Sequence, residues 1–300
     1  MDAPSTRSLS ALVGADRPVR RHRVRGVLQA AFRRKTFTIG VVLIAIFAFC
    51  ALFADTVAHQ SYSKVDYKAK MLSPSSEHIF GTDAQGRDIF SRVVHGTRVS
   101  FKVAFVSVLI ATVIGVPLGL FAGFFGGWPD ILISRFLDAM FAFPVLLMAI
   151  AILAITGVGL KGAIIAIGLI AIPEFARVSR STVIAEKEND YVLAARAIGC
   201  SAQRIVFRQI VPNTLGPIVV LVSLGFAFAI LNETALSFLG LGAQPPTPSW
   251  GADLADGRRY LRDDPWLCVF PGVAIFLFVL AINLTGDGLR DLLDPRRNKR

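Results

Sequence analysis

The chain has 300 residues, of which 54% are hydrophobic and 18% are charged, against roughly a quarter charged in soluble domains. The formal net charge is +11, and the mean hydropathy is +0.59. This composition excludes a disordered chain and argues against an ordinary soluble domain. Three scattered cysteines give neither a disulfide framework nor a CxxC zinc site.

Residues 1–35 form a basic segment with nine lysines and arginines against two acids. An excess of lysine and arginine near a membrane span marks the cytoplasmic side, so we predict a cytoplasmic tail close to anionic lipid. A signal peptide is the alternative. The apolar segment that follows is too long for one and lacks a cleavage context, so residues 36–55 are expected to be an uncleaved first span.

Six uncharged segments are expected to cross a membrane, because a bilayer core needs about 20 apolar residues of helix. They cover residues 36–54, 103–129, 139–160, 162–173, 209–232 and 265–286. The fourth segment has only 12 residues, a length typical of a buried or re-entrant segment. It must nevertheless cross if the three basic regions are to share one side. We therefore predict an all-α membrane protein with six transmembrane helices and both termini in the cytoplasm.

Residues 56–98 are predicted to form an outer loop, followed by a core of five helices over residues 99–295. The loop carries charges of both signs, which suits either contact with another protein or a self-folded cap. The four histidines, His22, His59, His78 and His95, lie in the tail or in this loop. We expect them to be solvated side chains rather than metal ligands.

Glycines and polar residues inside the spans give further candidates. The second span has a glycine at every fourth position, which predicts close packing against a neighbouring helix: Gly115, Gly119, Gly123 and Gly127. Polar groups within spans are functional-site candidates by default. The pathway candidates are Asn232, Glu233 and Asn283. For the first two, anchoring at the outer interface is the alternative.

The sequence contains none of the common motifs for catalysis or nucleotide binding. There is no GxxxxGK[ST] loop for nucleotide phosphates, no HExxH and no GxSxG. We therefore expect no enzyme activity, no metal site and no cofactor in this chain. The positive charge is divided among loops without a nucleic-acid motif, so nucleic acid is not an expected partner.

Residues 187–213 form the most informative loop. Asn189 or Asp190 is predicted to cap a short helix, and Gly199 to end it in a left-handed conformation. Ser201 is expected to cap a second helix over residues 202–210, which Pro212 stops. The small side chains of the first helix leave a flat surface that suits insertion into a groove on another protein. A purely structural loop is the alternative.

The motif Ala194-Ala195-x-x-x-Gly199, followed by Ile210-Val211-Pro212, resembles the EAA loop of importer-type ABC transporter permeases. Leu193 stands where the glutamate of that motif would be. Residues 78–92 and 233–251 resemble segments of dipeptide and oligopeptide permeases, and the chain most resembles their "C" subunit. The resemblance covers about residues 35–295.

The resemblance implies a type I ABC importer permease fold in the inner membrane and import of dipeptides or oligopeptides. It implies a homologous second permease, two subunits that bind ATP and Mg, and an extracytoplasmic substrate-binding protein that can contact the outer loop. In this family the EAA loop docks on the ATPase, and the matching residues here are Asp190, Ala194, Ala195, Arg196, Gly199 and Pro212.

Several alternatives remain at this stage. Nickel, glutathione and antimicrobial-peptide systems share these motifs, so the cargo of the same machine is open. A secondary transporter is a rival class, although a midplane acid or broken helices for ion coupling are not evident in the sequence. A membrane enzyme is disfavoured because no nucleophile–base pair or metal-ligand set is present.

Overall fold

The computed structural model describes residues 35–293, so the predicted basic tail and the last residues lie outside the described part. The described residues form helices and one isolated bridge, and no strand. Five helices are long and apolar enough to cross a membrane. They are α2 (Lys35–Leu52), α4 (Ile89–Phe125), α7 (Leu160–Lys187), α10 (Val211–Phe238) and α12 (Trp266–Leu293).

The sixth crossing is made by two helices, α5 (Gly127–Phe141) and α6 (Val145–Thr156), with a bend of 96° between them. Helix direction supports this assignment. The end of α7 lies at the end of α4, because Lys187 Nζ donates to the Phe124 carbonyl at 3.0 Å. The start of α7 lies at the end of α10, where Gly159 N donates to the Leu241 carbonyl at 3.2 Å. The α5–α6 pair must therefore connect opposite ends of the helix bundle.

The third predicted span, residues 139–160, is not one straight helix. Phe141 ends α5, and Pro144 takes the N-cap position of α6 with ψ of 133°. Proline lacks a backbone N–H and disfavours helical geometry in the residue before it. Counting the residues between charges cannot detect such a break. The fourth predicted span, by contrast, is confirmed as the 28-residue helix α7.

Helices α4 and α7 pack closely at the centre of the fold. A Cβ added at Gly115 would lie 2.7 Å from the Cβ of Phe175, and one at Gly123 would lie 2.8 Å from the Arg180 carbonyl oxygen. At Gly119 an added Cβ would collide with the Ala176 carbonyl. The absence of side chains on this face of α4 thus permits close approach of the two backbones. The fourth glycine, Gly127, instead starts α5 in open space with φ of +59°.

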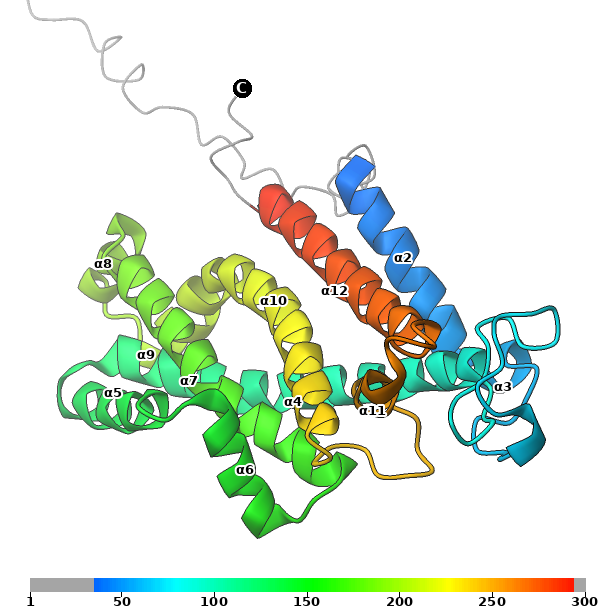
Figure 1. Cartoon of the computed structure of the whole chain (residues 1–300). Helices are drawn as coiled ribbons and strands as arrows, with labels where there is room; N and C mark the ends of the chain where they lie inside the picture. The colour runs from blue at the N-terminus through cyan, green and yellow to red at the C-terminus, as the bar shows by residue number, and fades with distance from the viewer. Residues whose placement is uncertain (1–34, 294–300) are drawn as a thin grey trace, which may run out of the picture.

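Helices α2 and α12 lie side by side at the other edge of the bundle (Figure 1). Gly40 permits this contact, since a Cβ there would lie 2.6 Å from Thr285 Oγ1. Most of α2 faces outward, with exposed apolar side chains such as Ile39 and Phe49. Such a surface is expected of a helix that contacts lipid or another membrane subunit.

Short helices occupy the two ends of the molecule (Figure 1). At the cytoplasmic end, as the basic residues orient the chain, lie α8 (Asp190–Ala197), α9 (Ala202–Ile205) and the π-helical turn η2 (Val206–Ile210). At the outer end lie α3 (Ala54–Val57), η1 (Tyr67–Ala69), α11 (Trp250–Gly257) and η3 (Arg258–Tyr260).

Helix α4 begins earlier than the sequence predicts. Asp88 caps it by accepting from Ser91 N at 2.8 Å, so residues 89–98 of the predicted outer loop are helical. A side-chain cap stabilises the free N–H groups of a first turn by roughly 1 kcal/mol. The charged and polar residues in this stretch concealed the helix from a count of apolar residues.

Candidate functional site

The loop of residues 187–213, called the coupling loop below, is built by local rules. Gly199 has φ of +78° and follows α8. The N–H of Cys200 donates to the Ala195 carbonyl, and that of Gly199 to the Arg196 carbonyl, both at 3.0 Å. This pair of bonds is a Schellman motif, which requires a residue with positive φ. The predicted left-handed end of the helix is thus present at Gly199.

The predicted starts of the two short helices are also present, with one difference. Ser201 caps α9 by accepting from Arg204 N at 3.4 Å. Asn189 stands at the N-cap of α8, but its side chain donates to the Glu186 carbonyl at 3.2 Å instead of capping. Asp190 lies in the first turn of α8 and is exposed, where its charge favours the helix N-terminus.

The expected stop at Pro212 is wrong. The backbone runs from α9 through η2 into α10 without a break, and Pro212 lies in the first turn of α10. Proline is tolerated there because its missing N–H needs no helical partner at that position. The N–H of Val211 bonds to the Val206 carbonyl, five residues back, as a π-helical turn requires.

The two short helices pack on the ends of α4 and α7 through a buried apolar group, called the loop cluster below. Leu120, Phe124 and Cys200 pack against it in a partly buried state. Its buried members are Val183, Val192, Ala195, Ile205 and Ile210. Ala195 therefore faces inward, whereas Ala194, Arg196 and Gly199 are exposed.

The outer surface of the coupling loop is unusually apolar for a segment outside the membrane spans. Leu193 is 51% exposed, Ile198 80% and Phe207 70%. Large exposed apolar side chains in a group with charged neighbours mark interaction surfaces. A Cβ at Gly199 would meet nothing within 4 Å, so this glycine serves the backbone turn and an open approach rather than internal packing.

Tyr191 connects the coupling loop to two long helices. Its hydroxyl donates to Glu186 of α7 and accepts from Asn213 Nδ2 of α10 at 3.1 Å. Partial burial, with the Glu186 carboxylate as a second cause, raises the pKa of Tyr191 to about 12. The phenol therefore stays protonated and remains a donor at neutral pH.

The pathway candidates occupy different environments. Glu233 has no exposed surface, and its Oε1 accepts from Ser237 Oγ at 2.6 Å and Ser249 Oγ at 2.7 Å. The amide of Asn232 donates to the Phe228 carbonyl at 2.8 Å, and Asn283 is half-buried on α12. The side chains of Asn232 and Glu233 thus bond to other residues and not to one another, and neither bonds to Asn283.

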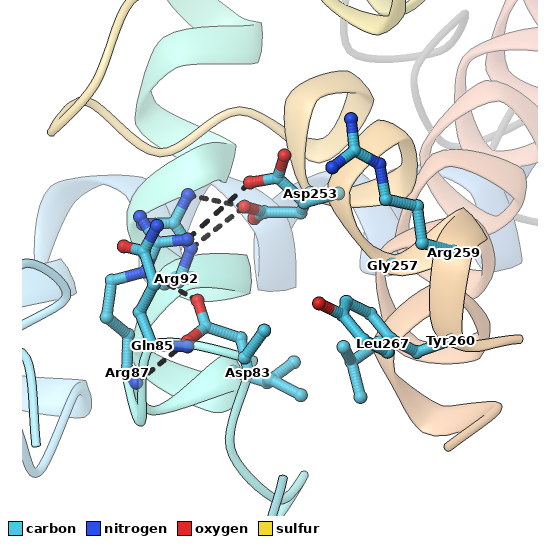
Figure 2. Close-up of a pocket in the computed structure, with 12 residues that line it drawn as sticks. Asp83, Gln85, Arg87, Arg92, Asp253, Gly257, Arg259, Tyr260 and Leu267 are labelled. Carbon is cyan, nitrogen blue, oxygen red and sulfur yellow. Dashed lines mark hydrogen bonds and ion pairs between the residues drawn. The ribbon is translucent and has the colours of Figure 1, made fainter. Parts of the chain in front are cut away.

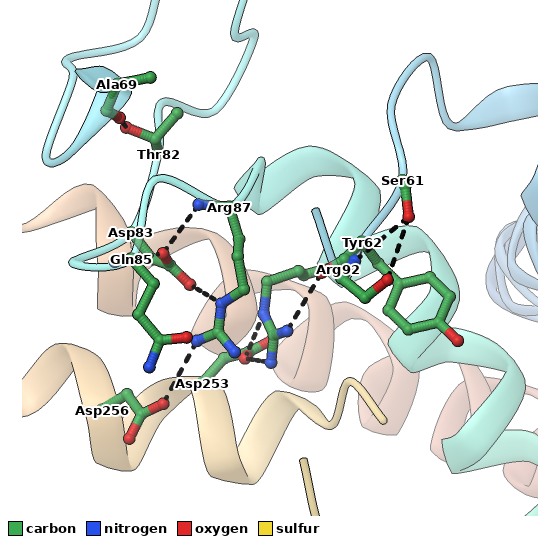
Figure 3. Close-up of polar contacts among 11 residues, drawn as sticks. Ser61, Tyr62, Ala69, Thr82, Asp83, Gln85, Arg87, Arg92, Asp253 and Asp256 are labelled. Carbon is green, nitrogen blue, oxygen red and sulfur yellow. Dashed lines mark hydrogen bonds and ion pairs between the residues drawn. The ribbon is translucent and has the colours of Figure 1, made fainter. Parts of the chain in front are cut away.

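At the outer end, ion pairs join the predicted outer loop to α11. Arg92 Nε donates to Asp253 Oδ1 of α11 at 2.8 Å (Figure 3). Within the loop, Arg87 Nε lies 2.5 Å from Asp83 Oδ2. Arg87 also lies 3.6 Å from Asp256. Burial raises the pKa of Asp253, while the charge of Arg92 opposes that rise. The contacts show that this segment folds against the rest of the chain.

The same residues line a cavity of about 150 Å³ between the outer loop and α11 (Figure 2). Asp83, Arg87 and Arg92 lie on one side of it, and Arg259, Tyr260 and Leu267 lie on the other. Trp250 fixes α11 beside this cavity. It is fully buried, and its Nε1 donates to the Val93 carbonyl at 2.9 Å.

The expectation of solvated histidines is wrong for two of them. His78 is buried, with Nδ1 3.0 Å from Asp88, and His95 is buried, with Nε2 3.1 Å from Asp55. Bonds from His95 and Arg98 lower the pKa of Asp55. Sequence patterns gave no sign of these partners, because each pair forms only when the loop folds. Within residues 35–293 no group of three or more His, Cys, Asp or Glu side chains has a metal-binding arrangement.

The described residues form a bundle of apolar helices long enough to cross a membrane, with an exposed apolar loop at one end and a folded cap at the other. Residues 115–299 match the family described as binding-protein-dependent transport system inner membrane component. The chain therefore belongs to this family of ABC importer permeases.

Curated relatives cover nearly the whole chain. A dipeptide transport system permease protein DppC of Alkalihalophilus pseudofirmus is 47% identical over 264 residues, covering 88% of this chain and 87% of the relative. A glutathione transport system permease protein GsiD of Shigella flexneri is 46% identical over 267 residues, with 88% of each chain covered.

Solved structures of the MetNI methionine ABC transporter in inward-facing conformations share the fold. One has a TM-score of 0.58 at 18% identity and covers 68% of this chain and 96% of that chain. This similarity confirms the predicted type I permease fold.

Proposed function

We propose that this permease imports short peptides, with ATP hydrolysed on separate partner subunits. Relatives named for dipeptide transport and for glutathione transport support a peptide cargo, since glutathione is itself a tripeptide. The observation that carries the coupling part of the proposal is the exposed apolar surface of the coupling loop above a buried loop cluster.

The proposed assembly contains a homologous second permease, two ATP-binding subunits and an extracytoplasmic binding protein. ATP and Mg bind on the ATPase subunits, and this chain forms half of the translocation pathway. ATP binding draws the two coupling loops together and opens the pathway outward, and hydrolysis resets it. Asp190, Ala194, Arg196 and Gly199 are exposed on the surface that we assign to the ATPase.

Roles in the coupling loop differ in this proposal. Ala195 packs inward and Pro212 starts α10, so both shape the loop from inside. Leu193 replaces the glutamate of the family motif, so docking here relies on apolar contact more than on an ion pair at that position.

We also propose that Asn232, Glu233 and Asn283 line the translocation pathway, on different grounds for each. Asn232 and Asn283 are half-buried polar groups on α10 and α12. Glu233 holds the start of α11 through Ser249, and its Oε2 has no hydrogen-bond partner among the described residues. A buried acid with an unpaired oxygen calls for a functional explanation, so we keep Glu233 among the pathway candidates.

Cargo is tested with the complete complex in proteoliposomes. Uptake of a labelled dipeptide is measured in competition with unlabelled dipeptides, longer peptides, glutathione and Ni²⁺, and the ligand bound to the purified binding protein is identified by mass spectrometry. Competition by peptides is the expected result. No uptake of the labelled dipeptide, together with no peptide on the binding protein, would contradict a peptide cargo.

A further inference from the structure

Phe124 in the last turn of α4 is contacted in three ways, by the loop cluster, by Arg196 of the coupling loop and by Lys187 at the end of α7. Its ring packs against the loop cluster. The guanidinium carbon of Arg196 lies 5.8 Å from the centroid of the same ring, within the range of a cation–π contact. The carbonyl of Phe124 accepts from Lys187 Nζ at 3.0 Å, which places a positive charge at the C-terminal end of α4.

The neighbouring phenylalanines do not share this role. Phe121 and Phe125 are 49% and 58% exposed and are not among the partly buried residues around the loop cluster; the ring of Phe121 contacts that of Phe125, not that of Phe124. Three aromatic rings thus stand within one turn and a half of helix, and the coupling loop covers one of them. Phe121 therefore offers a matched control on the same helix.

The loop is also attached to the neighbouring helices, to α7 through Val183 of the same loop cluster and to both α7 and α10 through Tyr191. Tyr191 reaches α7 and α10 through hydrogen bonds at the surface, where water competes for the same groups. The contact with α4 is apolar, with Leu120 and Phe124 partly buried against the cluster members Val192 and Ile210, which have no exposed surface. Buried apolar contact resists separation more than exposed hydrogen bonds do.

The far end of α4 is also held. Asp88 caps its first turn, and Arg92 in that turn pairs with Asp253 of α11 (Figure 3). We infer that Phe124 is a positioning residue that seats the coupling loop on α4, so that the loop and this helix move as one body. This inference rests on the proposed coupling to an ATPase, and it adds α4 to α7, which the loop directly follows, as a helix that receives the movement.

The first test compares three variants in the reconstituted complex. Phe124→Leu keeps an apolar side chain but removes the ring, Phe124→Tyr keeps the ring, and Phe121→Leu is the control. Transport per ATP hydrolysed is expected to fall about two- to fivefold in Phe124→Leu, the factor that loss of one cation–π contact at an exposed arginine gives. Phe124→Tyr and Phe121→Leu are expected to leave the ratio of transport to ATP hydrolysis unchanged.

A merely structural role predicts a different pattern. It would lower assembly of the complex, ATP hydrolysis and transport together, whereas a positioning role lowers transport and leaves ATP hydrolysis and the amount of assembled complex in place. An unchanged ratio of transport to hydrolysis in Phe124→Leu, or a joint loss of all three, would overturn the inference.

A crosslink gives an independent test. Leu120→Cys is joined to the native Cys200 by a short bismaleimide, in a chain whose other two cysteines are replaced by serine. Both positions border the loop cluster. If the loop and α4 move together, the crosslinked complex keeps transport. Loss of transport on crosslinking, or no crosslink at all, would overturn the inference.

A failure of the inference can be told from a failure of the proposed function. Gly199→Val strains the exposed turn of the coupling loop directly, whereas Phe124→Leu changes only the ring that packs on the loop cluster. If Gly199→Val uncouples transport while Phe124→Leu does not, the loop couples to the ATPase but is not seated on α4 through this ring. If neither variant affects transport, coupling through this loop is itself contradicted.

Discussion

Gly199 is the residue on which the shape of the coupling loop depends most directly. Its φ of +78° lies in the left-handed region, which costs an ordinary L-residue roughly 1–2 kcal/mol. A β-branched side chain fits that region worst, and asparagine tolerates it best after glycine. Because a side chain added at Gly199 would meet no neighbour, variants at this position test the backbone geometry of the turn alone.

Replacement of Gly199 by valine is expected to uncouple transport from ATP hydrolysis. We predict that Gly199→Val lowers transport by the reconstituted complex at least tenfold, because the Schellman turn must rearrange at a cost of more than about 1.4 kcal/mol. Gly199→Asn is the control and should retain most of the activity. Equal activity of the two variants would show that the turn geometry is irrelevant.

The Arg92–Asp253 pair at the outer end has a predictable energetic signature. Asp253→Asn leaves a buried guanidinium without its counter-charge, which costs about 3–5 kcal/mol, whereas replacing both residues by leucine costs much less. Thermal unfolding in detergent measures both variants. A double variant less stable than Asp253→Asn would contradict a structural role for the pair.

At the scale of elements, the close packing of α4 on α7 depends on small residues. Gly119→Leu would place a side chain against the Ala176 carbonyl, and Val113→Leu enlarges a side chain that is already exposed on the same helix. We predict that Gly119→Leu abolishes assembly of the complex, and that Val113→Leu assembles normally, as measured by size-exclusion chromatography. Normal assembly of both would disprove the packing argument.

Local rules predicted the elements that are decided locally. The turn at Gly199, the cap at Ser201 and the short fourth span all follow from neighbouring residues or from charge on the two sides of the membrane. The π-helical passage at Pro212 and the bend before α6 were missed, because the bonds that compensate for a proline depend on the surrounding helices.

Tertiary partners explain the other differences. His78 and His95 are buried because the folded loop provides Asp88 and Asp55. Phe124 has no feature in the sequence that distinguishes it from the phenylalanines beside it, and only the folded coupling loop selects it. Contacts between residues far apart in sequence carry no local pattern, so the sequence alone did not reveal them.

For the whole molecule, the arrangement of six crossings predicts which positions are accessible from each side. In right-side-out membranes, a membrane-impermeant maleimide is expected to label Lys64→Cys in the outer loop and not Ser201→Cys in the coupling loop. Permeabilisation should allow labelling at Ser201→Cys. Both positions have the exposure that labelling requires. Labelling of both in intact membranes would contradict the crossing of the bent α5–α6 pair.

The central claim is that this chain transports only as part of an ATP-driven complex, with its coupling loop as the link. The most direct measurement is uptake of a labelled dipeptide into proteoliposomes containing either this chain alone or the complete complex with its binding protein. The account predicts uptake by the complete complex with ATP, and none without ATP or by this chain alone. Uptake by this chain alone, driven by an ion gradient without ATP, would contradict it.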